Sequence, residues 1–356
     1  MKILYFIDQS INSNLSILIK IKAQITCWIE YGVEVNIFSF LDRALYSVSK
    51  NGNDNIKIKL EKYFDYLKWS PWKLKSIFET LDYELVYTRW KLYKPFIVSS
   101  FLSNNRKYVL EINSNDLLEL WIQNKIKYLY NLLTRSILIK KASGLVCVTN
   151  ELVKLMKPIN HNSILISNGI YVTSYPFVPC TDNKKPNLVF IASNPKRAPH
   201  GLDKIILMSK FLKEFTFHII GANGNNRDNL IYHGILSNEK AADIIKNADF
   251  GISSLSLYRL KLEEACPLKS RQYLAMGIPI IYGYKDPDIK DDYLFALKLP
   301  NSEDNVISNI KLIRQFIFDN FKKQDIRKMA RVFAEENLDL KNKEKQRIEF
   351  FIKILE

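Results

Sequence analysis

The feature that most constrains the fold is an alternation of apolar runs and helical patterns that begins at the N-terminus. Residues 2–7 form an apolar run, residues 15–29 carry apolar residues at helical spacing, and residues 33–40 form a second apolar run. A strand, a helix and a strand at this spacing make a βαβ unit, whose two strands must be parallel. The sequence therefore predicts an α/β fold built on a parallel sheet.

The same alternation starts again after a polar, proline-bearing stretch at residues 175–186. With 356 residues, the chain is long enough for two domains that each bury a core. We expect an N-terminal domain over residues 1–172 and a second domain over residues 173–338, with a final helix at residues 339–356 returning to the first domain. Two consecutive Rossmann-like domains with ligand loops at their strand ends predict a central cleft between them.

The net charge of +15 calls for an anionic partner. Nucleic acid, an acidic membrane surface and phosphorylated substrates all fit that charge. Nucleic acid is the least favoured, because the charge is spread over both halves and no nucleic-acid-binding motif is found. No apolar run reaches the ~20 residues that span a bilayer, and the N-terminus lacks the pattern of a signal sequence. A cytoplasmic protein is expected.

The sequence gives little sign of a metal site or of a disulfide framework. The four cysteines are scattered, with no C-x-x-C pair, and only four histidines accompany them. No G-x-G-x-x-G follows the first strand pattern, which weakens a dehydrogenase interpretation.

Two segments, residues 63–78 and 117–141, mix aromatic and basic residues in a helix-like pattern. Their aromatic residues are Tyr66, Trp69, Trp72, Trp121, Tyr128 and Tyr130. Such a mixture suits a surface that rests against anionic lipid headgroups. Aromatic residues in the core with lysines in water explain the pattern equally well.

Residues 264–279 hold the densest group of candidate site residues. Pro267 precedes a short helical pattern that stops at Gly277 and Pro279, after the apolar run at residues 250–255. The free N–H groups and the dipole of such a helix favour an anion at its N-terminus. Lys269 and Arg271 would add positive charge to that anion site.

This stretch resembles the C-terminal domain of GT-B glycosyltransferases, family 4 in particular. The family carries Glu-x7-Glu ahead of Gly-x-Pro; here Glu264 matches the first glutamate, and Gln272 stands at the second. Gly221, His233-Gly234 and the run from Asp249 to Ser254 also match the pattern. The resemblance implies two Rossmann-like domains in a GT-B arrangement.

The resemblance also assigns roles to residues of the second half. Glu264 would bind the hydroxyl groups of the donor sugar, and Gln272 would bind the nucleotide ribose in place of a carboxylate. Lys196 and Arg197 would bind the diphosphate together with the helix start. The residues expected at the helix start are Pro267, Leu268, Lys269 and Ser270, and those expected at the base are Gly234, Ile235 and Leu236.

In the first half, many family members place a histidine after the strand that here covers residues 108–113. Glu111 and Asn113 take that position, with Asp116 and Arg89 as further candidates for a contact with the donor sugar. Glu111 is equally well explained as a structural carboxylate at a strand end.

The family relationship implies a retaining, metal-independent glycosyltransferase that uses a nucleotide-sugar donor and no other cofactor. A carbohydrate or lipid-linked acceptor of a bacterial surface polysaccharide, met at the inner face of the plasma membrane, would explain the basic aromatic segments. The alternatives are a phosphorylase or epimerase of the same fold, a non-catalytic member suggested by Gln272, and a basic nucleic-acid-binding protein.

Overall fold

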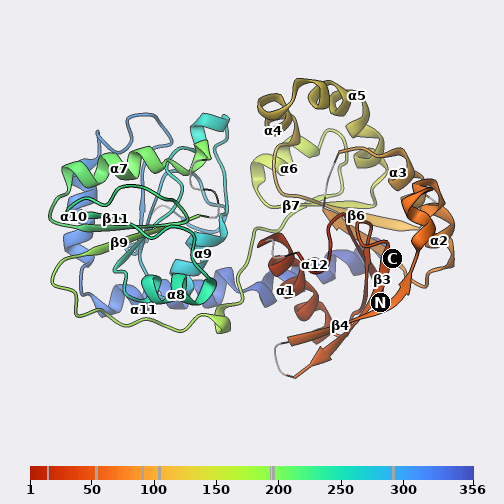
Figure 1. Ribbon diagram of the computed structural model, residues 1–356, viewed down its shortest axis with the longest axis horizontal. Coiled ribbons are helices and arrows are strands. Elements are labelled where there is room, and N and C mark those ends of the chain that lie inside the picture. Colours follow the sequence, from red (N-terminus) through yellow and green to blue (C-terminus); the bar gives the residue numbers. More distant parts are fainter. Residues whose placement is uncertain are drawn as a thin grey trace. The chain divides into compact units, whose positions relative to one another are not determined.

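The computed structural model describes residues 1–13, 16–52, 55–89, 92–102, 106–192, 194, 197–290 and 293–356. The chain divides into two compact units (Figure 1). The first unit comprises Met1–Ile166 and Leu340–Glu356, and the second comprises Ser167–Asp339. This division lies a few residues before the boundary expected near residue 172.

The sheet of the first unit has eight strands among the described residues, in the order β4-β3-β2-β1-β5-β6-β7-β8. The strands are β1 (Lys2–Ile7), β2 (Glu34–Ser39), β3 (Ala44–Asn51), β4 (Asn55–Tyr63), β5 (Leu85–Arg89), β6 (Lys107–Ile112), β7 (Gly144–Cys147) and β8 (Ser163–Leu165). All pair in parallel except β3 and β4, which form an antiparallel hairpin at the edge. The sequence pattern did not predict β3, because a hairpin strand needs no helix before it and alternates polar with apolar residues.

Helices cover both faces of this sheet. Helices α1 (Ser16–Glu30) and α12 (Leu340–Leu355) share one apolar core with the sheet, in which the Trp28 ring packs 5.1 Å from Tyr87 and 5.4 Å from Phe351. Phe78 of α2 (Leu74–Thr80) and Phe101 of α3 (Pro95–Phe101) both contact Phe6 on the opposite face. The last helix therefore belongs to the core of the first unit, although it follows the second unit in the sequence.

The two aromatic and basic segments are not single helices. Residues 65–80 form two short 3₁₀ turns, η1 (Asp65–Lys68) and η2 (Pro71–Lys73), ahead of α2, with Pro71 at the start of the second turn. The other segment forms α4 (Asp116–Gln123) and α5 (Lys125–Lys141), separated by the extended residue Asn124. The Asn124 side chain accepts from the Lys127 N–H at 2.9 Å, which caps α5. Helix α6 (Asn150–Met156) follows β7.

The second unit has a sheet of six parallel strands within its described residues, in the order β11-β10-β9-β12-β13-β14. The strands are β9 (Asn187–Ile191), β10 (Thr216–Ile220), β11 (Leu230–Tyr232), β12 (Phe250–Ile252), β13 (Ile280–Tyr282) and β14 (Ala296–Lys298). The helices and turns are η4 (Val172–Ser174), η5 (Ala198–His200), α7 (Leu202–Phe211), α8 (Asn238–Lys246), η6 (Leu257–Leu260), α9 (Leu268–Ala275), α10 (Ile310–Asn320), α11 (Gln324–Phe333) and the π-helical turn η7 (Ala334–Leu338).

The strands of this sheet are apolar runs because both faces are buried. Residues of α8, α9 and α11 form one core with the sheet, and residues of α7 and α10 form the other. Neighbouring residues Leu188 and Val189 of β9 point into opposite cores. All six strand ends therefore lie at one edge, where the connecting loops meet.

Candidate functional site

The loops that follow β9 and β12 are joined at the carboxyl edge of the second sheet. The Leu255 N–H donates to the His200 carbonyl at 3.2 Å, and the Ser256 N–H donates to the Pro199 carbonyl at 3.1 Å. Between these bonds, Gly201 has a φ of +71°, and a Cβ there would lie 2.7 Å from the Ser256 hydroxyl. The two loops thus form one connected surface in front of the sheet.

The loops after β10 and β11 are also joined to each other by a backbone hydrogen bond. The Gly221 N–H donates to the Gly234 carbonyl at 2.7 Å. Gly221 has a φ of +99°, and a Cβ on it would lie 1.9 Å from the Ala192 carbonyl oxygen, so only glycine fits. Ile235 is then left 84% exposed, while Leu236 packs partly against the core. The predicted base-binding residues lie in a loop whose shape is set by backbone bonds.

Helix α9 begins at the same edge, with Pro267 at its N-cap and no side-chain cap. The Ser270 hydroxyl donates to the Pro267 carbonyl at 2.8 Å and lies 3.1 Å from the Tyr284 hydroxyl, which also contacts Ser253. Ser270 is fully buried, so its side chain fixes the helix start and is not open to a ligand. Leu268, by contrast, is exposed.

Lys269 places a buried amino group at this edge. Its Nζ is buried without a hydrogen-bond partner and lies 4.0 Å from the centre of the Phe190 ring. The residue as a whole is half-buried, although its Nζ is fully buried. Burial lowers the pKa of Lys269 to about 7. A bound anion would compensate this charge.

Arg271 does not supply the free positive charge that the sequence suggested. Its guanidinium is fully buried, contacts Asp286, and donates to Asp288 at 2.7 Å and to the Asn168 carbonyl at 3.1 Å. Although burial opposes the charged form, the carboxylates hold the pKa of Arg271 well above its usual range. Arg271 therefore anchors α9 to its neighbouring loops.

The loop after β9 holds two further titratable side chains, those of Arg197 and His200. Arg197 is exposed, and the His200 Nδ1 lies 3.3 Å from the Ser254 hydroxyl. Burial, with the charges of Lys269 and Arg197, lowers the pKa of His200 to about 3, so this imidazole is neutral at pH 7. Lys196, the second cation predicted for this loop, lies outside the described residues.

Glu264 and Gln272 are both half-buried at this end of the second unit. The chain around Glu264 runs beside Lys285: the Ala265 N–H donates to the Lys285 carbonyl at 3.0 Å, and the Lys285 N–H donates to the Glu263 carbonyl at 2.8 Å. This short bridge fixes the backbone of Glu264 ahead of α9, on which Gln272 stands. The roles of these two residues toward a donor remain predictions.

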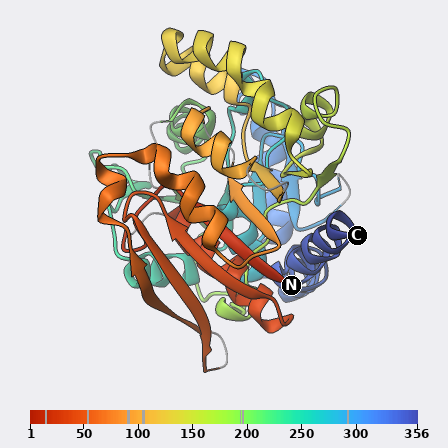
Figure 2. The ribbon, with the colours of Figure 1, turned by 90° about the vertical axis from the view of Figure 1, so that its right-hand side faces the viewer.

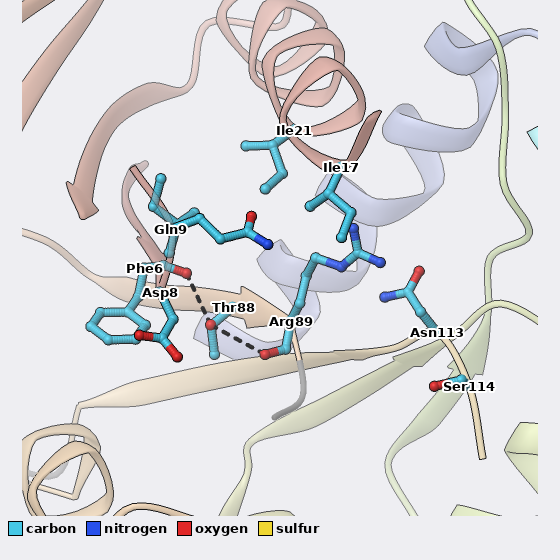
Figure 3. Close-up of a pocket in the computed structure, with 10 residues that line it drawn as sticks. Phe6, Asp8, Gln9, Ile17, Ile21, Thr88, Arg89, Asn113 and Ser114 are labelled. Atoms are coloured by element: carbon cyan, nitrogen blue, oxygen red, sulfur yellow. Dashed lines mark hydrogen bonds between the residues drawn. The ribbon is translucent and has the colours of Figure 1, made fainter. Parts of the chain in front are cut away.

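The first unit has a separate pocket at the carboxyl ends of β1, β5 and β6, with a volume of about 160 Å³. Figure 3 shows the Arg89 side chain extending across it toward Ile17 and Asn113. The Thr88 hydroxyl donates to the Phe6 carbonyl at 2.9 Å, which ties two of the strand ends together. Polar groups of Asp8, Gln9 and Ser114 also line the pocket, so it can take a ligand that carries hydroxyl groups.

Glu111 lies behind this pocket in a buried network. Its carboxylate accepts from Lys20 at 2.9 Å, Gln24 at 3.1 Å, Tyr87 at 2.5 Å and Asn113 at 2.8 Å. Burial alone would raise the pKa of Glu111, but Lys20 and nearby arginines hold it well below its usual range. Of the two interpretations of Glu111, the structural one is favoured, because the side chain is fully buried.

Asn113 is half-buried and lines the pocket, whereas Asp116 does not reach it. The Asp116 carboxylate is instead paired with Arg135, at 2.8 Å. Sequence reasoning missed Lys20 and Arg347, which both contact Glu111. No local signal could have found them, since Lys20 belongs to α1 and Arg347 to α12, both far from Glu111 in the sequence.

Known structures resemble the whole chain. The sucrose-phosphate synthase of Thermosynechococcus elongatus matches with a TM-score of 0.73 and 12% identity, covering 99% of this chain and 98% of its own. HepE of Anabaena in complex with UDP matches with a TM-score of 0.68 and 13% identity over 99% and 100%. The lipopolysaccharide outer core galactosyltransferase WaaB matches with a TM-score of 0.64 and 12% identity over 99% of both chains.

The chain has the GT-B fold. The expected fold class, with two Rossmann-like domains built on parallel sheets, is thereby confirmed. No known protein-family model matches the sequence, and no curated protein matches it either.

Two further observations concern metals and membranes. Within the described ranges, no three histidine, cysteine, aspartate or glutamate side chains gather closely enough to hold a metal ion. None of the helices in the described part of the chain combines the length and apolar character that a membrane crossing requires.

Proposed function

We propose that this protein is a glycosyltransferase that moves a sugar from a nucleoside diphosphate sugar to a carbohydrate or lipid-linked acceptor. The observation that carries the proposal is the buried Lys269 ammonium, which has no hydrogen-bond partner at the N-terminus of α9. A charge removed from water without a counter-ion is costly, and a diphosphate would supply two negative groups at that position.

The neighbouring groups suit the same ligand. Arg197 is exposed on the β9 loop, and the start of α9 offers N–H groups and the positive end of its dipole. One of the structures that resemble this chain supports the proposal, because HepE is known in complexes with UDP and with UDP-glucose. We assign Glu264 to the donor sugar, Gln272 to the ribose, and residues 234–236 to the base.

The proposed reaction needs fixed positive charge more than it needs an acid or a base. As the bond between the anomeric carbon and the diphosphate breaks, negative charge grows on the leaving group. Lys269, Arg197 and the helix N-terminus would stabilise that charge in place before the reaction starts. Because these cations belong to the protein, we propose a transfer that requires no metal ion. We also propose retention of the anomeric configuration, which rests on the resemblance to the family alone.

The acceptor side is proposed for the pocket of the first unit. The pocket side chains can bind an acceptor through its hydroxyl groups or a phosphate. The side chains concerned are those of Arg89 and Asn113, with Asp8 and Gln9 after β1. Synthesis of a bacterial surface polysaccharide at the inner face of the plasma membrane would provide such an acceptor.

Thermal-shift measurements with UDP-, GDP- and ADP-sugars test the donor class first, since a ligand at 100 times its Kd adds about 2.7 kcal/mol to the stability of the native state. Transfer is then measured as nucleotide release that depends on an acceptor. Glu264→Ala should abolish transfer yet still bind the free nucleotide, while the neighbouring Glu263→Ala should keep both. Release driven by inorganic phosphate instead of an acceptor would indicate a phosphorylase, and no release with any donor would indicate a non-catalytic protein.

A further inference from the structure

Helix α5 turns an apolar stripe toward solvent. Ile126 is 80% exposed, Leu129 59%, Leu133 78% and Ile137 40%. These residues follow one another at steps of three and four, so they lie on one face of the helix. Trp121 and Ile122 of α4, both at least half exposed, continue the apolar surface next to it. Figure 2 shows α4 and α5, the yellow helices, on the outside of the first unit.

The face of α5 that is turned inward is polar over much of its length. Asn131 and Arg135 are buried there and bind Asp116 of α4, at 2.6 Å and 2.8 Å. Only near its end does α5 bury apolar side chains, those of Leu138 and Ile139. A helix on the surface of a water-soluble protein shows the opposite arrangement, with its apolar face toward the core. The outward stripe therefore calls for a partner.

The charges around the stripe identify the chemistry of that partner. Lys125, Lys127, Lys140 and Lys141 are exposed at the two ends of α5, and the helix contains no aspartate or glutamate. The Lys125 ammonium lies 3.1 Å from the centre of the Trp121 ring, so a cation and an aromatic side chain lie side by side at the start of α5. A second copy of the chain would bring like charges together on this face, which opposes self-association.

An anionic lipid surface satisfies both features of α5. Its acyl boundary takes up aliphatic side chains, and its headgroups attract lysines at the edge of the buried stripe. Lysine stems can also lie along the apolar surface while their ammonium groups reach the headgroups. Nucleic acid would use the lysines but would leave the stripe of Ile126, Leu129, Leu133 and Ile137 exposed.

We propose that α4 and α5 form a membrane-docking surface that lies in the interface of an anionic bilayer, with the stripe Ile126, Leu129, Leu133 and Ile137 facing the acyl chains. This inference does not depend on the proposed transfer reaction, because it rests on the exposure and the charges of one helix. Its test measures lipid binding and not turnover.

The experiment is co-sedimentation of the full chain with vesicles of phosphatidylglycerol and, separately, of neutral phosphatidylcholine. We expect binding to phosphatidylglycerol that weakens as salt is added. The double variant Leu129→Gln/Leu133→Gln should bind at least about tenfold more weakly, since two large apolar side chains are lost from the interface. Lys140→Gln and Lys141→Gln should each weaken binding about fivefold and reduce its salt dependence.

The matched control is Ile307→Gln/Leu312→Gln, which removes two apolar side chains that are 54% and 48% exposed on the second unit. It should bind the vesicles like the unaltered chain. All variants alter exposed positions, and unchanged melting temperatures would show that they fold. Equal binding by the α5 variant and the control, or no binding of the unaltered chain, would overturn the proposal. So would a concentration-dependent dimer that Leu129→Gln/Leu133→Gln abolishes, because the stripe would then be a contact between copies.

Discussion

Replacing Lys269 with methionine should stabilise the ligand-free protein at neutral pH. Methionine keeps a flexible, unbranched side chain of similar length but removes the buried ammonium. The fall in the pKa of Lys269 from 10.5 to about 7 corresponds to about 5 kcal/mol at about 1.4 kcal/mol per pH unit. Most of this cost, about 4 kcal/mol, is already present at pH 7, and the variant would avoid it.

The pH dependence gives this prediction its sign. Because burial depresses the pKa of Lys269, the unfolded chain binds more protons than the folded chain between about pH 7 and pH 10.5. The free energy of unfolding of the unaltered protein therefore rises with pH over this range and is highest above pH 10.5. The Lys269→Met variant lacks this dependence, so its advantage should shrink steadily and vanish near pH 10.5.

The assay is denaturation by urea at several pH values between 7 and 10.5, followed by circular dichroism. All five tryptophans precede residue 122, so tryptophan fluorescence would report the first unit alone. Lys240→Met, at an exposed position of α8, is the control and should change stability little at any pH. A stability difference between Lys269→Met and the unaltered chain that is the same at every pH would refute the reasoning, since the ammonium would then be compensated in the folded protein.

Three other perturbations follow from the structure. Glu111→Gln leaves Lys20 and Arg347 without their shared buried carboxylate and should destabilise the protein by about 3 kcal/mol in urea denaturation; a cost below about 1 kcal/mol would contradict the network described. Gly221→Ala should cost about 2 to 4 kcal/mol because its Cβ would collide with the Ala192 carbonyl, whereas Gly32→Ala, at a similar positive φ in open space, should cost only about 1 kcal/mol. Equal costs at the two glycines would show that the close approach is not rigid. Burial and the nearby His233 lower the pKa of His218 to about 4, so stability that is present above pH 6.5 should be lost as the pH falls toward 4, and His218→Gln should flatten this loss in a melting-temperature profile.

The fold could be predicted from the sequence because parallel strands buried on both faces leave an unmistakable pattern. Residues 2–7 and 187–192 read as apolar runs for that reason. Strand β3 left no such pattern, since it lies in an edge hairpin in which only Ala44 is fully buried. The break at Asn124 was missed because α4 and α5 follow each other directly.

The site was predictable as a region and not as a set of charges. Lys269 and Arg271 stand two residues apart and look equivalent in the sequence, but Asp286 and Asp288 neutralise only the second. That pairing depends on how the loop after β13 returns to α9, which local patterns do not encode. In the same way, Arg347 contacts Glu111 although 236 positions separate them in the sequence. The residues around Glu111 therefore do not indicate that α12 helps to bury it.

The central claim, that a nucleoside diphosphate binds beside Lys269, is tested most directly by calorimetric titration of a nucleotide-sugar found in the donor panel. At pH 8.5 the free Lys269 amine is neutral and a diphosphate would favour its protonation, so binding should take up close to one proton, read from the dependence of the heat on the buffer. Lys269→Met should bind at least about tenfold more weakly and take up no proton through this group. Equal affinity and equal proton uptake in the variant would contradict the claim.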